Sequence, residues 1–108
     1  ISFSNNDELE IFCLAPWQIE NISAVVDHFH NSASFQEMPE NVIKNYVKYI
    51  FQLFSKNISI SLISYDGWNK NNTLDPKTLN NLFGDRLVIK EIPELVNTEK
   101  KNFYLISQ

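Results

Sequence analysis

A long helical pattern followed directly by an alternating one constrains the fold of this chain more than any other feature. Between positions 42 and 54, apolar residues recur at spacings that cover more than half of a helix circumference. They are Val42, Ile43, Tyr46, Val47, Tyr49, Ile50, Phe51, Leu53 and Phe54. Lys44, Lys48 and Gln52 recur every four residues and mark the polar side of the same helix. We therefore expect a long central helix that begins near Pro39 and is buried on two sides.

Residues 58–65 carry the clearest period of two in the chain. Ile58, Ile60 and Leu62 alternate with serines, so one face of the predicted strand is apolar. A helix and a strand that each have an apolar face become stable by burying those faces against one another. The two adjacent patterns therefore predict a layer of helix packed on a sheet.

Two elements are predicted before this pair. Residues 9–14 are rich in strand-forming side chains and predict a strand. Pro16 follows and suits the first turn of a helix. Apolar residues continue at helical spacing, at Ile19, Ile22, Val25, Val26 and Phe29. We expect the polar cluster at positions 31–34 to end this first helix.

Three further elements are predicted after residue 74. Asp75 and Pro76 have the chemistry of a helix start, and Gly84 that of a helix end. Residues 87–92 and 103–106 predict two strands, the first of which stops at a proline. We expect the last two strands to be antiparallel neighbours. The helix between the second and third strands permits a parallel pair there.

The order of these patterns predicts one globular domain over residues 1–108, of the α+β (mixed α/β) class. One sheet of about four strands packs against the long buried helix, with two shorter helices beside it. No uncharged apolar run approaches the ~18 residues of a membrane helix, so we expect no membrane span. No basic region precedes an apolar stretch near residue 1, so we expect no signal peptide.

The sequence offers little catalytic chemistry. Gly67 and Gly84 are the only glycines, which excludes a phosphate-binding loop and a dinucleotide fingerprint, because each needs several. Cys13 is the single cysteine, and a central position in an apolar strand predicts a buried, inert side chain that forms no nucleophilic pair with His28. His28 and His30 are two residues apart on the predicted helix, so their imidazoles point to different sides. We expect no metal site, no cofactor and no enzymatic activity.

Charge is distributed unevenly along the chain. The first 43 residues contain seven acids and no Lys or Arg, whereas residues 44–108 carry six acids and nine bases. The early acids are Asp7, Glu8, Glu10, Glu20, Asp27, Glu37 and Glu40. Glu20 and Asp27 are seven residues apart and share one side of the predicted first helix. A surface of one sign repels nucleic acid and attracts a basic protein partner. The alternative is a solvated face that only keeps the protein in solution, and the sequence does not choose between the two.

Aromatic side chains outside the core pattern are the other candidates for partner contacts. Trp17 lies in the first turn of the predicted first helix, and Trp68 lies in a polar loop beside a glycine. Trp is enriched at binding hot spots, although either ring could instead fold back onto the core. Phe35 lies in a connecting segment and is a weak core candidate and a modest interface candidate.

A small acidic domain of this kind resembles a bacterial immunity protein of the contact-dependent growth inhibition type. The likeness rests on size, charge and the run LEIFCLAPWQIENISAVVDHF with its acids and Trp17. The resemblance implies a monomer that acts in the cytoplasm, binds one cognate toxin, a basic nuclease of the RNase type, and occludes its cationic cleft. Carboxylates then compete for the groups that hold RNA phosphates, and the implied contributors are Glu20, Asp27, Glu37 and Glu40, with Trp17 as a buried anchor.

Two other classes are also compatible with the sequence. Secretion chaperones and adaptors are small acidic α/β proteins that hold a client, and they act as dimers with a large apolar interface. An enzyme or a pocket protein would need a concave site with convergent polar groups, to which no pattern in the chain points.

Overall fold

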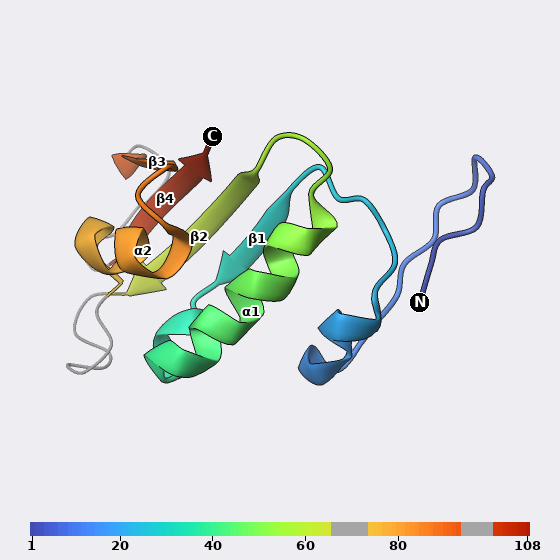
Figure 1. Ribbon diagram of the computed structural model, residues 1–108, viewed down its shortest axis with the longest axis horizontal. Helices are drawn as coiled ribbons and strands as arrows, with labels where there is room; N and C mark the ends of the chain where they lie inside the picture. Colours follow the sequence, from blue (N-terminus) through green and yellow to red (C-terminus); the bar gives the residue numbers. More distant parts are fainter. Residues whose placement is uncertain (66–73, 94–100) are drawn as a thin grey trace.

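The computed structural model describes residues 1–65, 74–93 and 101–108 (Figure 1). In chain order, their elements are η1 (Pro16–Asn21), β1 (Phe29–Ser32), η2 (Ser34–Glu37), α1 (Glu40–Leu53), β2 (Ser59–Tyr65), α2 (Pro76–Phe83), β3 (Val88–Glu91) and β4 (Lys101–Ser107). The two η elements are short 3₁₀ helices. The predicted α+β class is therefore confirmed, with one mixed four-stranded sheet and helices beside it.

The strands lie in the order β1-β2-β4-β3. β1 is parallel to β2, with α1 forming the crossover between them. β4 lies between β2 and β3 and is antiparallel to both. The predicted antiparallel pairing of the last two strands is confirmed. The suggested parallel pairing of the second and third predicted strands is wrong, because β4 separates β2 from β3.

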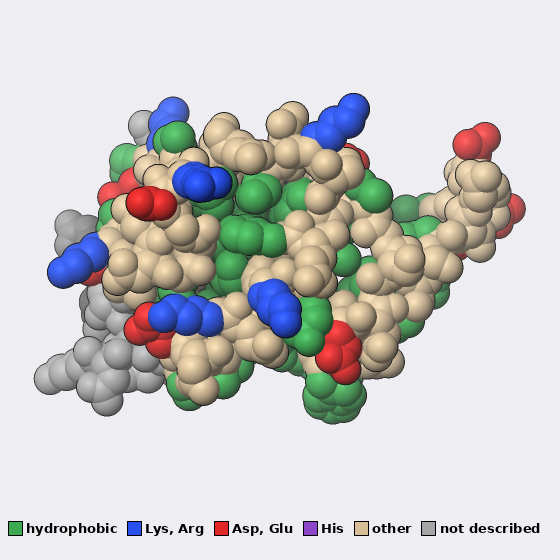
Figure 2. Space-filling view, in the orientation of Figure 1, with side chains coloured by type: hydrophobic (Ala, Val, Ile, Leu, Met, Phe, Trp, Pro, Cys, Tyr) green, Lys and Arg blue, Asp and Glu red, His purple; other side chains and the backbone are tan. Residues whose placement is uncertain are grey.

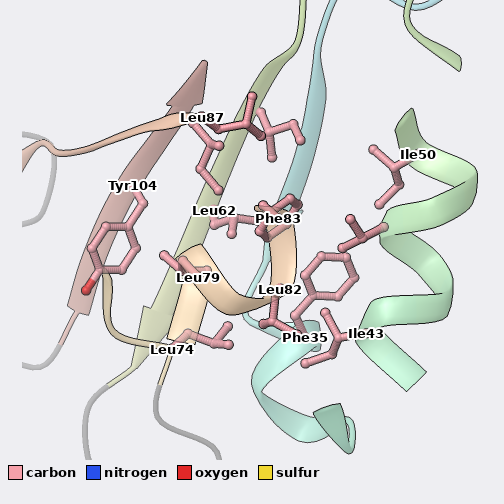
Figure 3. Close-up of a cluster of buried hydrophobic side chains, with 13 residues drawn as sticks. Phe35, Ile43, Ile50, Leu62, Leu74, Leu79, Leu82, Phe83, Leu87 and Tyr104 are labelled. Carbon is pink, nitrogen blue, oxygen red and sulfur yellow. The ribbon is translucent and has the colours of Figure 1, made fainter. Parts of the chain in front are cut away.

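Both α-helices cover the same face of the sheet (Figure 1). The core between the layers contains Ile43, Val47 and Ile50 of α1, Leu79, Leu82 and Phe83 of α2, and Ile60, Leu62, Tyr104 and Ile106 of the sheet. Figure 3 shows Ile43 and Ile50 pointing from α1 toward the side chains of α2 and the sheet. Phe35, the weak core candidate, belongs to this core and is only 3% exposed. Its ring stacks on Phe29 at 6.1 Å between centroids.

The prediction that α1 is buried on two sides is wrong. Its fully buried positions, Ile43, Val47, Ile50 and Leu53, form a single stripe. Val42 is exposed, whereas Tyr46, Tyr49 and Phe51 are only half-buried. The sheet and α2 supply one layer of contacts, so the remaining aromatic side chains lie along the borders of that stripe.

The N-terminal third departs most from its prediction. Residues 9–14 form no strand, the helix from Pro16 ends at Asn21, and Phe29 belongs to β1. Between η1 and β1 the backbone bonds to distant parts of the chain instead of to its own preceding turn. The N–H of Ser23 donates to the carbonyl of Ile1, and the N–H of Val26 donates to that of Leu53. β-branched side chains in this segment also favour extended backbone.

The predicted ends of α2 are confirmed. The Asp75 carboxylate accepts a hydrogen bond of 2.7 Å from the Thr78 N–H, with Pro76 in the first turn. This hydrogen bond lowers the pKa of the Asp75 carboxyl. Gly84 follows the helix with φ of +96°, a conformation that other residues rarely adopt.

One buried amide completes the edge of the sheet where β1 has ended. Gln36 of η2 is 2% exposed. Its Nε2 donates to the carbonyl of Tyr65 at 2.9 Å, and its Oε1 accepts from the Tyr65 N–H at 2.5 Å. The side chain thus supplies the donor and acceptor that a neighbouring strand would otherwise provide at the end of β2.

Candidate functional site

Residues 1–14, which we call the N-terminal arm, project from the layered part of the molecule (Figure 1). The arm folds back on itself, and the rings of Phe3 and Phe12 lie 5.0 Å apart. The ammonium group of Ile1 donates to the carbonyl of Asn21 at 2.7 Å. The arm therefore has a defined path but no strand partner within the described residues.

Apolar side chains are exposed on and beside this arm. Of the eleven large exposed hydrophobic residues in the described parts of the chain, eight lie between residues 1 and 25. They are Ile1, Phe3, Leu9, Ile11, Phe12, Leu14, Trp17 and Val25. Leu9 is 87% exposed, Ile11 78% and Trp17 76%. Exposed apolar side chains that cluster in this way typically mark an interaction surface.

The same segment carries acids that form no ion pair with any residue the structure describes. Asp7, Glu8 and Glu10 lie on the arm, and Figure 2 shows acidic side chains at its tip, with the visible Lys and Arg side chains over the rest of the molecule. The Glu10 carboxylate accepts two hydrogen bonds from the Ser4 N–H, at 3.2 and 3.0 Å. Hydrogen bonds from Ser4 lower the pKa of the Glu10 carboxyl, so this group stays negative to a lower pH than an ordinary Glu.

The four acids predicted for partner binding lie at separate places along the fold. Glu20 is on η1, where its Oε2 accepts a hydrogen bond of 3.3 Å from the hydroxyl of Tyr49. Glu40 begins α1 and forms an ion pair of 3.1 Å with Lys44. Residues 40 and 49 are separated by about 14 Å of helix length, so these two acids lie beside opposite halves of α1.

Asp27 and Glu37 lie elsewhere along the chain, between η1 and α1 in sequence order. Asp27 lies just before β1, and Glu37 ends η2. The prediction that Glu20 and Asp27 lie on one side of a helix is wrong, because η1 ends at Asn21. Of the predicted aromatic contacts, Trp17 is exposed, whereas Trp68 lies outside the described residues.

A groove of about 420 Å³ separates the segment after η1 from the second half of α1. We call it the η1–α1 groove. Its lining includes Glu20, Val25, Tyr49, Gln52 and Leu53. Lys48 Nζ lies 5.6 Å from the centroid of the Tyr49 ring. The groove thus combines one carboxylate, an aromatic ring, other polar groups and apolar side chains. The sequence does not reveal it, since residues 20 and 49 meet only in the folded chain.

Two histidines converge on the other face of the sheet. His28 lies just before β1 and His30 lies on it, so their side chains are on the same face of the extended chain. The prediction that a helix directs the two imidazoles to different sides is therefore wrong. The Oγ of Ser61 lies 2.8 Å from His28 Nε2 and 2.6 Å from His30 Nδ1. His28 Nδ1 lies 2.8 Å from the Oγ of Ser59.

This histidine and serine cluster connects β1 to β2. A serine beside an imidazole that is itself held by a second hydroxyl has the connectivity of an activated nucleophile. Ser61 is buried, however, and its hydroxyl is shared between the two imidazoles. Among the described residues no three His, Cys, Asp or Glu side chains group together as metal ligands. We interpret the cluster as a set of side-chain hydrogen bonds that stabilises the pairing of the short strand β1 with β2.

The prediction for Cys13 is also wrong. Cys13 is exposed, because the arm that carries it is not a buried strand. Both ring nitrogens of His28, its hypothetical partner, bond to serines of β2. Across residues 1–65, 74–93 and 101–108, no helix has the length and apolar character needed to cross a membrane.

Comparison with known proteins adds no family to these observations. No protein-family profile matches the chain, and no characterised protein shows significant sequence similarity to it.

Proposed function

We propose that this protein binds and neutralises a basic protein toxin, as an immunity protein does, and that the N-terminal arm carries much of the contact. One observation supports the proposal above the others: the exposed apolar residues coincide with the stretch that contains no Lys or Arg. Apolar side chains supply the affinity of an interface, and surrounding charges supply steering and orientation. The proposed partner is a basic nuclease domain, and the proposed site of action is the cytoplasm.

Inhibition in this proposal is by occlusion. Acids on the arm, together with Glu20 and Asp27, compete for the cationic groups that hold the phosphates of a nucleic acid substrate. Trp17, Leu9 and Ile11 become buried against the toxin and slow its dissociation. Glu40 is expected to contribute less, because Lys44 already neutralises it. The protein itself performs no catalysis in this scheme.

A secretion chaperone or adaptor is the second candidate, and the exposed apolar arm also favours it. Such a protein buries its apolar surface in a dimer as well as against a client. Sedimentation velocity at micromolar concentration separates the two candidates, because the immunity proposal expects a monomer and the chaperone proposal a dimer.

The test uses any basic C-terminal domain of an exported protein whose gene is found next to the gene for this chain. Binding is measured by biolayer interferometry at low and moderate salt, and inhibition by the rate of RNA cleavage. The double variant Leu9→Ser, Ile11→Ser is expected to weaken binding by at least about tenfold, a loss of roughly 1.4 kcal/mol. Val88→Ser is the matched control, since Val88 is 61% exposed on β3, away from the arm.

The outcomes separate clearly. A loss confined to the arm variant, with a folded protein by circular dichroism, supports the proposal. Equal binding by the arm variant and the wild type contradicts it, as does the absence of binding to any basic domain encoded beside the protein.

A further inference from the structure

We propose that the η1–α1 groove is a subsite for one arginine side chain of the basic partner, with Glu20 as its counter-charge. This inference rests on the proposed function and specifies the chemistry that the partner presents. No pattern in the sequence predicts this groove. The inference assigns it one ligand, an arginine side chain.

Among the described carboxylates that accept a hydrogen bond or form an ion pair, Glu20 has the weakest interaction to offset its negative charge. Glu10 accepts two backbone hydrogen bonds from Ser4, and Glu40 pairs with Lys44. Glu20 accepts only the neutral hydroxyl of Tyr49, at 3.3 Å, which is longer than the 2.5–3.0 Å usual for a hydroxyl donor. In the described part of the chain the one ion pair is that of Glu40, so the Glu20 charge has no cationic partner.

The lining of the groove suits a side chain that is apolar along its length and charged at its end. Ile22, Val25 and Leu53 supply apolar surface, and Glu20 and Gln52 supply oxygens that accept hydrogen bonds. Arg and Lys side chains bury their aliphatic part along such surfaces and keep the charged head at a polar end. A carboxylate or phosphate ligand is disfavoured, because Glu20 would repel it.

Arginine fits this site better than lysine. The planar guanidinium has several donors in a fixed fork, so it can serve both Glu20 and the amide of Gln52. It also stacks on aromatic rings and is less strongly hydrated than an ammonium group. Lys48 already lies over the Tyr49 ring at 5.6 Å yet does not pair with Glu20, so the carboxylate remains open to a second cation.

The experiment is a two-dimensional NMR titration of the full chain with N-acetyl-L-arginine methylamide. The probe is raised to about 50 mM, because one side chain alone binds with millimolar affinity at best. N-acetyl-L-citrulline methylamide is the neutral control of the same shape. We expect the amide signals of Ser23, Tyr49 and Gln52 to move with the arginine probe only.

Two matched variants make the result specific. Glu20→Gln keeps the size of the side chain and removes its charge, and it should abolish the response. Glu91→Gln removes an exposed carboxylate of β3 and should leave the response intact. Equal shifts with citrulline, or shifts that persist in Glu20→Gln, would overturn the inference. Equal shifts with N-acetyl-L-lysine methylamide would overturn the choice of arginine.

Failure of this inference can be told from failure of the proposed function. If Glu20→Gln binds the toxin domain as tightly as wild type while the Leu9 and Ile11 variant does not, the arm interface stands and the groove subsite falls. If no basic domain binds at all, the proposed function falls, and the arginine titration still reports whether the groove recognises the side chain.

Discussion

Replacing Gln36 with Leu tests how much the end of the sheet depends on a side chain acting in place of a strand. Gln36 is buried and makes two hydrogen bonds to the backbone of Tyr65. Leu has a similar size, so the variant mainly removes these bonds and opens little space. An ordinary hydrogen bond contributes about 1 kcal/mol net, and a buried group left without a partner costs about 1–3 kcal/mol.

The expected loss of unfolding free energy is therefore about 2 kcal/mol. Tyr65 is 36% exposed as a residue, which sets the value below the sum for two fully buried groups. For a domain of about this size, each kcal/mol lowers Tm by about 4–8 °C, so the variant should melt about 10 °C lower. Urea denaturation followed by circular dichroism measures the free energy directly.

Gln52→Leu is the control, because Gln52 is an exposed residue of the α1 surface. It should change stability by no more than about 0.5 kcal/mol. Hydrogen exchange adds a local readout, since the amide of Tyr65 should lose protection in Gln36→Leu and keep it in Gln52→Leu. A Gln36→Leu protein as stable as the control would refute the reasoning that this amide completes the sheet edge.

Three further predictions concern other parts of the molecule. The pKa of Asp75 is lowered in the folded state, so its cap stabilises the protein above the ordinary Asp pKa of about 3.9 and loses this contribution as pH falls through the folded value. The side chain of Asp75→Asn does not titrate. Thermal melts should therefore show the stability of this variant, relative to wild type, rising as pH falls from about 6 to about 3. Glu20→Lys combined with Asp27→Lys should slow association with a basic toxin domain and weaken its salt dependence while the fold survives; unchanged association rates at low salt would contradict the steering role. The exposed thiol of Cys13 should react with a thiol reagent in the native protein as fast as in the urea-unfolded chain; strong native-state protection would show that the arm is buried in solution.

The parts of the fold that follow local rules could be predicted from the sequence. The alternation at 58–65 corresponds to β2, and the cap chemistry at Asp75 and Gly84 bounds α2. The stripe from 42 to 54 corresponds to α1, although half-buried aromatic residues at its borders made the helix look more deeply buried than it is. Each of these elements satisfies its pattern within a few residues of chain.

The segment from Ile19 to Phe29 could not be predicted because its structure depends on distant partners. Its apolar residues happen to follow helical spacing, but the backbone of Ser23 bonds to Ile1 and that of Val26 to Leu53. Parallel pairing of β1 with β2 is likewise a contact between residues about thirty positions apart. Sequence periodicity carries no information about such pairings.

The candidate site shows the same division. The acidity of the first 43 residues follows directly from the sequence. The exposure of Trp17 and the hydrogen bond between Glu20 and Tyr49 could be established only from the fold. The ion pair of Glu40 with Lys44 could be predicted from the sequence, because Glu and Lys four residues apart on a helix commonly pair. This spacing indicates that the Glu40 charge is already paired and is a weaker candidate for partner binding.

The acidic run has two interpretations, solubility and attraction of a basic partner. Both are compatible with the same arrangement of side chains on the arm. Glu8 and Glu10 flank Leu9, and Ile11 follows directly, so charge and apolar surface alternate along the same exposed segment. Burying a Leu or Ile side chain is worth about 1.5–3 kcal/mol, which the free protein forgoes at each of these positions. We expect the neighbouring carboxylates to oppose association of this surface with copies of itself, because like charges on two copies repel one another. In the proposed function the same charges attract a basic protein, so we expect the arm to bury its apolar side chains against a cationic partner in preference to a neutral or acidic one.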